Sequence, residues 1–318
     1  MQTLKFWASM REWLDARRNV STYSIVAIDR SSGEMGVAVQ SHWFSVGSVV
    51  PWAEAGVGVV ATQAFVEAAY GPRGLALMKK GKTPQEALNV LLSRDPSRAV
   101  RQVAMLDAMG RTAAHTGSKC LPEAGHVSGP GFSAQANLMS SDRVWRAMAS
   151  AFQNSKGKLG FRLMASLEAG EAAGGDLRGR QSAAILVVST KRQRASWLGR
   201  SIELRVEDHP RPLVELRRLL GINEAYLHAN AGDELAAVGK MKKALAEYSL
   251  ASKLAPEIEE LRFWEAVALA EQGRVEESKP IFGRVFRKRR AWRRLLSALP
   301  AFGLLSVPEP VLHELTSL

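Results

Sequence analysis

Residues 23–41 read YSIVAIDRSSGEMGVAVQS. Two runs rich in β-branched residues, 23–28 and 36–41, flank the turn residues SSG at 31–33. Runs separated by turn residues in this way are typical of a β-hairpin. The segment GVGVVATQ at 56–63 continues the pattern and predicts a third strand. The chain therefore opens with antiparallel β-structure.

Helices in pairs follow these strands. The second helix has a clear start, with Thr83 as N-cap, Pro84 at its first position and Glu86 completing a capping box. Paired helices between groups of antiparallel strands do not build a doubly wound parallel sheet, in which single helices alternate with strands. The order predicts an α+β fold with two stacked sheets covered by helices on both outer faces. Its later elements are expected as strands at 100–107, 111–115 and 132–135, helices at 142–154 and 158–173, and strands at 181–188 and 202–206.

The region after Pro210 changes to long helical periodicity and contains an internal repeat. Small and aromatic residues recur at an offset of 34, which is the period of tetratricopeptide hairpins. An ordinary helical hairpin is the alternative. Two repeats are too few for a free solenoid, so we expect them to dock on the first domain or on another subunit. The matched pairs are Gly232 with Ala266, Gly239 with Gly273, Ala244 with Ser278 and Tyr248 with Phe282.

The chain is long enough, at 318 residues, for two folding units. We expect an N-terminal extension at 1–21, a first domain at 22–207 and a C-terminal tetratricopeptide-like domain at 208–318. Charged residues are scattered through the first 21 residues, which is unlike a secretory signal. No apolar run approaches the ~18 residues that a membrane-spanning helix needs. We therefore expect a cytoplasmic protein without a membrane segment.

The cysteine content and the net charge limit the remaining classes. Cys120 is the only cysteine, which excludes an internal disulfide and a zinc site built from several cysteines. The net charge is +12, and eight Lys and Arg residues lie between 279 and 294 without an acid among them. Such a run can meet phosphates. Because no aromatic-interleaved RNA motif accompanies it, a solvated helix face is the favoured interpretation, and nucleic acid is not expected as a partner.

Six short segments together resemble a bacterial family of unknown function that is numbered 1028. The resemblance extends from about residue 22 to 220, and it implies a fold similar to that of N-terminal-nucleophile (Ntn) hydrolases, a four-layer αββα sandwich. The segments are TYSIVA at 22–27, GVAVQS at 36–41, ATQA at 61–64, YGPRG at 70–74, HTG at 115–117 and GGDLRGRQS at 174–182.

The same resemblance implies a set of site residues. In Ntn hydrolases the first residue of the mature chain attacks an amide carbonyl, and its own α-amine acts as the base. Thr22 occupies the matching place ahead of the first strand. By resemblance, Asp176 and Ser182 hold the amine. The residues implied in substrate binding are Ser41, His42, Gln63, Gln135, Asn137 and Arg180, of which Gln135 and Asn137 lie on the oxyanion side.

Two hypotheses of function follow. The first is an amidohydrolase or peptidase-like enzyme that acts on a small amide or peptide without metal or cofactor, as a homo-oligomer. The second is a non-catalytic module that recruits a partner protein through residues 221–290. The second is favoured by the 21 residues that precede Thr22 and by the absence of a lysine at 49–52. Under it, Thr22 simply begins a strand and Asp176 forms a loop ion pair with Arg178 or Arg180.

Overall fold

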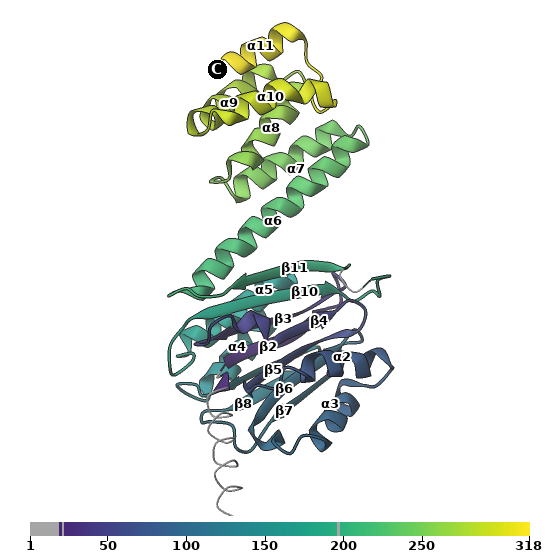
Figure 1. Ribbon diagram of the computed structural model, residues 1–318, viewed down its shortest axis with the longest axis vertical. Coiled ribbons are helices and arrows are strands. Elements are labelled where there is room, and N and C mark those ends of the chain that lie inside the picture. The colour runs from purple at the N-terminus through teal and green to yellow at the C-terminus, as the bar shows by residue number, and fades with distance from the viewer. Residues whose placement is uncertain (1–18, 21, 196–197) are drawn as a thin grey trace, which may run out of the picture. The chain divides into compact units, whose positions relative to one another are not determined.

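The computed structural model describes residues 19–20, 22–195 and 198–318 (Figure 1). The chain divides into two compact units, of which the first ends at Arg218 and the second comprises Leu219–Leu318. The boundary lies within the long helix α6 (Pro212–Ala237). Each unit is described by itself below.

The strands of the first unit form two antiparallel sheets. The predicted hairpin is confirmed, since β2 pairs with β3 from Thr22 opposite Ser41 to Asp29 opposite Glu34. Sheet A has the order β1 (Asn19–Val20), β5 (Gly58–Phe65), β6 (Arg101–Asp107) and β7 (Thr112–Thr116), with β4 (Pro51–Glu54) also paired to β5. Sheet B has the order β11 (Arg200–Val206), β10 (Ser182–Ser189), β3 (Glu34–Ser41), β2 (Thr22–Asp29), β9 (Phe132–Asn137) and β8 (Gly125–Gly129).

Two helix pairs cover the sheets. The helices α2 (Tyr70–Lys79) and α3 (Pro84–Ser93) contact β5 and β7 of sheet A, whereas α4 (Arg143–Asn154) and α5 (Leu159–Ala172) contact β9, β2 and β3 of sheet B. The capping box of α3 forms as predicted, because the Thr83 hydroxyl accepts from the Glu86 amide and the Glu86 carboxylate accepts from the Thr83 amide. The expected mixture of antiparallel sheets and paired helices is therefore confirmed.

The space between the two sheets is filled mainly by small aliphatic side chains. Val26, Val37 and Val39 of sheet B pack in one cluster with Val59 and Leu106 of sheet A, and all five are fully buried. Each buried valine or leucine contributes about 1.5–3 kcal/mol relative to exposure to water. Strand residues alternate between faces, so every second residue of these strands faces the other sheet. This alternation decides which polar residues also face inward.

The second unit is helical throughout its regular structure. Both bounds of α7 and α9 differ by 34 residues, as the sequence repeat requires, and Gly239 and Gly273 connect the helices with φ of 73° and 72°. An aromatic cluster around Phe263, Phe282 and Phe286 forms its largest core. No described helix is both long and apolar enough to cross a bilayer. The elements after α6 are α7 (Met241–Leu254), α8 (Glu259–Glu271), α9 (Val275–Lys288), α10 (Ala291–Ala298), the 3-10 turn η3 (Leu299–Phe302) and α11 (Glu309–Ser317).

Two glycines of α6 give a matched test of this packing. A methyl group at Gly232 would lie 2.6 Å from the Tyr248 ring, whereas one at Gly221 would meet nothing within 4 Å. We expect Gly232→Ala to destabilise the α6–α7 packing by about 1–3 kcal/mol through overpacking. Gly221→Ala should stabilise α6 by about 0.5–1 kcal/mol, because alanine favours a helix interior. Hydrogen exchange of peptides from α7 measures the first effect, and unchanged exchange in Gly232→Ala would contradict the packing described.

Candidate functional site

Thr22 lies at the head of the central strand β2. Across sheet B it pairs with Asn137 of β9 and with Ser41 of β3, and Ser41 pairs in turn with Ser182 of β10. Directly paired residues point to the same face of a sheet. That face looks toward sheet A, since Ser24, two residues beyond Thr22, donates its hydroxyl to Gln63 of β5. Four of the predicted site residues thus form one fully buried row between the sheets.

The chain changes sheets immediately before this row. Asn19 and Val20 pair with Phe65 and Ala64 in sheet A, whereas Thr22 begins its strand in sheet B. In the full chain the amine of Thr22 is part of the peptide bond to residue 21. A free α-amine at Thr22 would require cleavage of that bond.

Three amide side chains surround the main chain of Thr22. Gln63 Nε2 donates to the Thr22 carbonyl at 3.0 Å, and Asn137 Nδ2 donates to the same oxygen at 3.4 Å. Both nitrogens also donate to Gln102 Oε1 of β6, at 2.7 and 2.9 Å. Gln102 thereby links the C-terminal parts of β5 and β9, whose amides both bond to the first residue of β2. We call Gln63, Gln102 and Asn137 the amide cluster.

A second set of hydrogen bonds, farther along β2 and β9 from Thr22, supports the amide cluster. Gln63 Oε1 accepts from the Ser24 hydroxyl at 2.6 Å, and Ser24 accepts from Gln135 Nε2 at 2.6 Å. Ser133 completes the chain by donating to Gln135 Oε1 at 3.1 Å. Gln135, which was predicted to lie on the oxyanion side, thus lies beside Gln63, and its side-chain amide bonds to the Ser24 hydroxyl. Its amide orients the cluster through that hydroxyl.

The amide cluster also reaches the surface. Gln102 Nε2 donates to Thr116 Oγ1 at 2.9 Å, and that hydroxyl lies 2.9 Å from His126 Nδ1. Burial and the neighbouring His115 lower the pKa of His126, which keeps its ring neutral at pH 7. Thr116 and His126 line an open pocket of about 560 Å³ that also includes Cys120 and Glu123. Burial raises the pKa of the Cys120 thiol to about 11, so this pocket presents a protonated thiol rather than a thiolate.

The loop before β10 lies at the end of β3. Asp176 accepts from the His42 amide at 3.1 Å and forms an ion pair with Arg178 at 2.9 Å. The loop ion pair that the sequence left open is therefore formed with Arg178. The Ser182 hydroxyl donates to the Trp43 carbonyl and accepts from the Val46 amide at 3.0 Å. Ser182 thus fixes the turn that follows β3.

Arg180 lies on the other side of the sheet from the amide cluster. It forms an ion pair with Glu171 of α5, and Glu171 accepts from the Tyr23 hydroxyl at 2.7 Å. Burial and this carboxylate raise the pKa of Tyr23 well above its ordinary value. His42 Nδ1 lies 3.3 Å from the Arg180 carbonyl. His42, Asp176 and Arg180 therefore form a polar group of their own around the end of β3, apart from the amide cluster.

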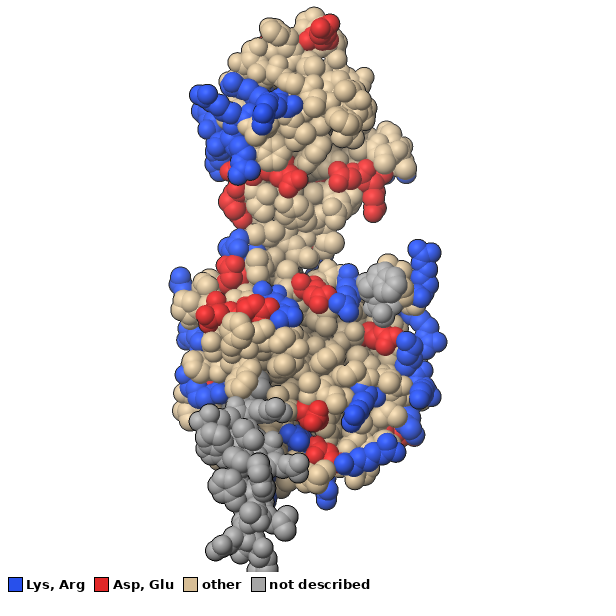
Figure 2. All heavy atoms as spheres, in the orientation of Figure 1, with Lys and Arg blue, Asp and Glu red and all other residues tan. Residues whose placement is uncertain are grey.

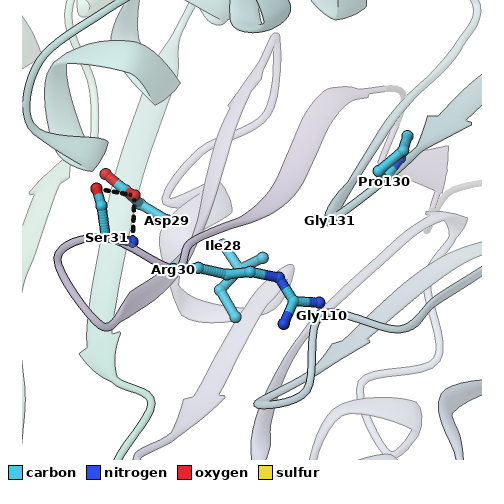
Figure 3. Close-up of a pocket in the computed structure, with 7 residues that line it drawn as sticks. All are labelled: Ile28, Asp29, Arg30, Ser31, Gly110, Pro130 and Gly131. Atoms are coloured by element: carbon cyan, nitrogen blue, oxygen red, sulfur yellow. Dashed lines mark hydrogen bonds between the residues drawn. The ribbon is translucent and has the colours of Figure 1, made fainter.

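A second pocket lies at the opposite end of β2. Figure 3 shows Arg30 extending toward Gly110, while the Asp29 carboxylate accepts from the Ser31 amide at 2.9 Å and from its hydroxyl at 2.6 Å. The pocket has a volume of about 470 Å³, and its wall contains none of the predicted site residues. The residues that the sequence singled out lie at the Thr22 end instead.

Comparison with known families identifies the first unit. A family of unknown function, DUF1028, matches residues 22–216. The chain belongs to this family. Its structure is similar to the crystal structure of the DUF1028 protein SPO2555 from Silicibacter pomeroyi, with 33% sequence identity and a TM-score of 0.57 over 63% of this chain and 84% of that one. Among curated proteins, none matches the chain.

Backbone strain in this DUF1028 unit is concentrated at the same end of the sheets. The described residues other than glycine that have positive φ are Ser45 at 57°, Ala64 at 67° and Leu138 at 54°. Ala64 directly follows Gln63, and Leu138 directly follows Asn137. The left-handed region costs an L-residue about 1–2 kcal/mol. Strain of this kind persists where the surrounding structure holds a site in place, and here it flanks both amides that bond the Thr22 carbonyl.

Part of the candidate site was not predicted from the sequence. Gln102, Thr116 and His126 were not predicted as site residues, although Thr116 lies in the HTG segment that carries the family resemblance. Gln102 is a polar residue whose inward-facing neighbours in β6, Ala104 and Leu106, are apolar, and it could have been noticed for that reason. No lysine is among the buried side chains of the described residues, and no group of three or more His, Cys, Asp or Glu within the described ranges is arranged to hold a metal ion. The groups available at Thr22 are hydroxyls and amides.

Gln102 is the residue whose loss should cost the first unit most stability. Its Oε1 accepts two hydrogen bonds, and the two hydrogens of its Nε2 are shared among Thr116 Oγ1 and the carbonyls of Gly125 and Ala136. Gln102→Leu leaves several buried polar groups unpaired, and each costs about 1–3 kcal/mol. We expect the free energy of unfolding to fall by about 2–5 kcal/mol in urea. Gln85→Leu on the exposed face of α3 is the control, and equal losses in the two variants would contradict a central role for Gln102.

The strain at Ala64 can be measured against a neighbour in the same strand. Ala61 and Ala64 are both buried in β5, but only Ala64 has positive φ. Glycine adopts positive φ without penalty. We expect Ala64→Gly to be more stable than Ala61→Gly by about 1–2 kcal/mol, although both remove one methyl group. Thermal unfolding of the two proteins tests this, and matching melting temperatures would show that Ala64 stores no strain.

Proposed function

We propose that the first unit is an Ntn-type hydrolase that cleaves a small amide or peptide through Thr22. The observation that carries the proposal is the position of Thr22, which heads the central strand of sheet B and faces the other sheet in a row with Asn137, Ser41 and Ser182. Helix pairs outside two stacked sheets are the arrangement expected of this superfamily. The family membership and the clustered strain support the same assignment.

The proposal requires cleavage before Thr22. The Thr22 hydroxyl would add to the preceding carbonyl carbon, its proton would pass to the amide nitrogen, and the C–N bond would break to leave an ester. Water would then hydrolyse the ester, which releases the upstream segment as a carboxylic acid and restores the hydroxyl beside a free amine. The amides of Gln63 and Asn137 hold the Thr22 carbonyl and so fix its main chain during both steps.

The mature site would use the same groups on a substrate. The Thr22 amine accepts the hydroxyl proton as Oγ attacks the substrate carbonyl, and the proton is then passed to the leaving amine. Water hydrolyses the resulting acyl ester. With no buried lysine among the described residues, the amine of Thr22 is the group that supplies the base. The pocket lined by Thr116 and His126 lies at the same end and gives solvent a route to the polar network.

A second candidate is a non-catalytic binding module. It is favoured by the complete burial of Thr22 and by the mutual bonding of Gln63, Gln102 and Asn137. In this case the 34-residue repeat of α7 and α9 is a tetratricopeptide-like region that recruits a partner protein through residues 221–290. The two candidates differ in one property, which is whether a chain beginning at Thr22 ever forms.

The intact mass of protein purified from its native host decides between them. We expect a chain that begins at Thr22 in the wild type and in Thr22→Ser, and a chain that retains the upstream residues in Thr22→Ala, since alanine has no nucleophile. Thr62→Ala, which removes another buried hydroxyl, should be processed normally. A β-lactone probe should then acylate the Thr22 peptide of the processed chain. An unprocessed wild type that resists the probe would reject the hydrolase and favour the binding module.

A further inference from the structure

The second unit carries a segregated positive surface. Its 100 residues hold fourteen Lys and Arg against thirteen Asp and Glu, so the unit as a whole is nearly neutral. None of the thirteen acids lies between 278 and 308, whereas eight of the fourteen basic residues lie between 279 and 294. Figure 2 shows Lys and Arg side chains gathered on the α9 side of this unit. We call residues 279–294 the basic surface.

The two lysines of the basic surface are already neutralised. Lys279 forms ion pairs with Glu276 and Glu314, and Lys288 forms one with Glu259. The six arginines form no ion pair with a described carboxylate, and Arg293 lies over the Phe286 ring at 5.5 Å. The uncompensated charge therefore consists of guanidinium groups, at Arg284, Arg287, Arg289, Arg290, Arg293 and Arg294.

The shape and the unpaired charges of this surface favour the phosphate backbone of a nucleic-acid strand as its ligand. Two hollows of about 470 and 410 Å³ flank Arg284, and the first is also lined by Gly283 and Arg287. The six arginines lie on three consecutive segments, with Arg284 and Arg287 on α9, Arg289 and Arg290 between the helices, and Arg293 and Arg294 on α10. A nucleic-acid strand carries one phosphate charge per about 3.4 Å. Guanidinium groups bind phosphate in a bidentate geometry. A hollowed surface also suits a strand better than a flat bilayer.

We propose that the basic surface binds the phosphate backbone of nucleic acid. Phosphate contacts carry no base information, so the binding is expected to be independent of sequence. From the sequence alone, a solvated helix face was the favoured interpretation of the basic residues at 279–294. The absence of an ion pair between these six arginines and any described carboxylate, together with the hollows beside Arg284, supports a binding surface instead. This inference does not depend on the chemistry proposed for Thr22.

Fluorescence anisotropy of the full chain with a labelled 20-nucleotide RNA of mixed sequence tests the proposal. Each phosphate contact with a single strand contributes about −0.7 to the slope of log K against log salt. We expect the combined variant Arg287→Gln, Arg290→Gln, Arg294→Gln to weaken binding at least tenfold and to reduce the slope by about 2, since three contacts are removed. Circular dichroism confirms that the variant is folded.

The control removes the same charge elsewhere in the unit. Lys240, Lys242 and Lys243 are exposed and lie outside the basic surface, so their combined change to glutamine should alter affinity less than threefold. Equal weakening in the two triple variants would overturn the proposal, because net charge alone would then account for binding. Tighter binding to anionic-lipid vesicles than to RNA, lost in the arginine variant, would overturn it in favour of a membrane surface.

Discussion

The requirement that buried amides be paired governs the first unit. Gln63, Gln102 and Asn137 lie between two sheets whose other inward-facing side chains are mainly aliphatic, where an unpaired polar group is costly. Their bonds to one another and to the Thr22 carbonyl are possible only in one register of β2, β9, β5 and β6. A shift of one residue in β5, β6 or β9 would turn an amide toward the helices and leave its partners unpaired. The amide cluster therefore specifies the register of these strands.

The amide cluster also explains why the backbone strain lies at Ala64 and Leu138. Gln63 and Asn137 turn their side chains inward, and the next residue of each has positive φ, Ala64 within the last part of β5 and Leu138 directly after β9. Several hydrogen bonds hold each amide, so the backbone cost of the next residue is tolerated. A purely apolar filling of this space would need neither the amides nor the strain. Among the described residues other than glycine, this strain occurs at the Thr22 end, where the local geometry is maintained at a cost in stability.

The sequence predicted the fold better than the site because the two depend on different information. Hairpin 23–41, the capping box at Thr83 and the helix pairs follow from local patterns, which the chain expresses over a few residues. The short strands β1, β4 and β8 were not predicted, since GHVSG and PWAE carry little β-propensity and pair only because a neighbouring strand is available. Gln102 and Asn137 meet across 35 positions of sequence, and no local pattern reveals such a contact. The family resemblance pointed to Asn137, whereas the partners of Gln102 are revealed only by the register of the sheets.

The two units use polar residues in opposite ways. In the first, uncharged amides and hydroxyls are buried and paired, so their effect is confined to short distances and depends little on salt. In the second, six arginines form no ion pair with a described carboxylate, so their field extends about a Debye length into solvent and weakens as salt increases. A buried network selects one geometry, whereas an exposed charged surface attracts any partner of opposite charge. The chemistry proposed for Thr22 depends on an arrangement of the first kind, and the proposed binding of nucleic acid depends on one of the second kind.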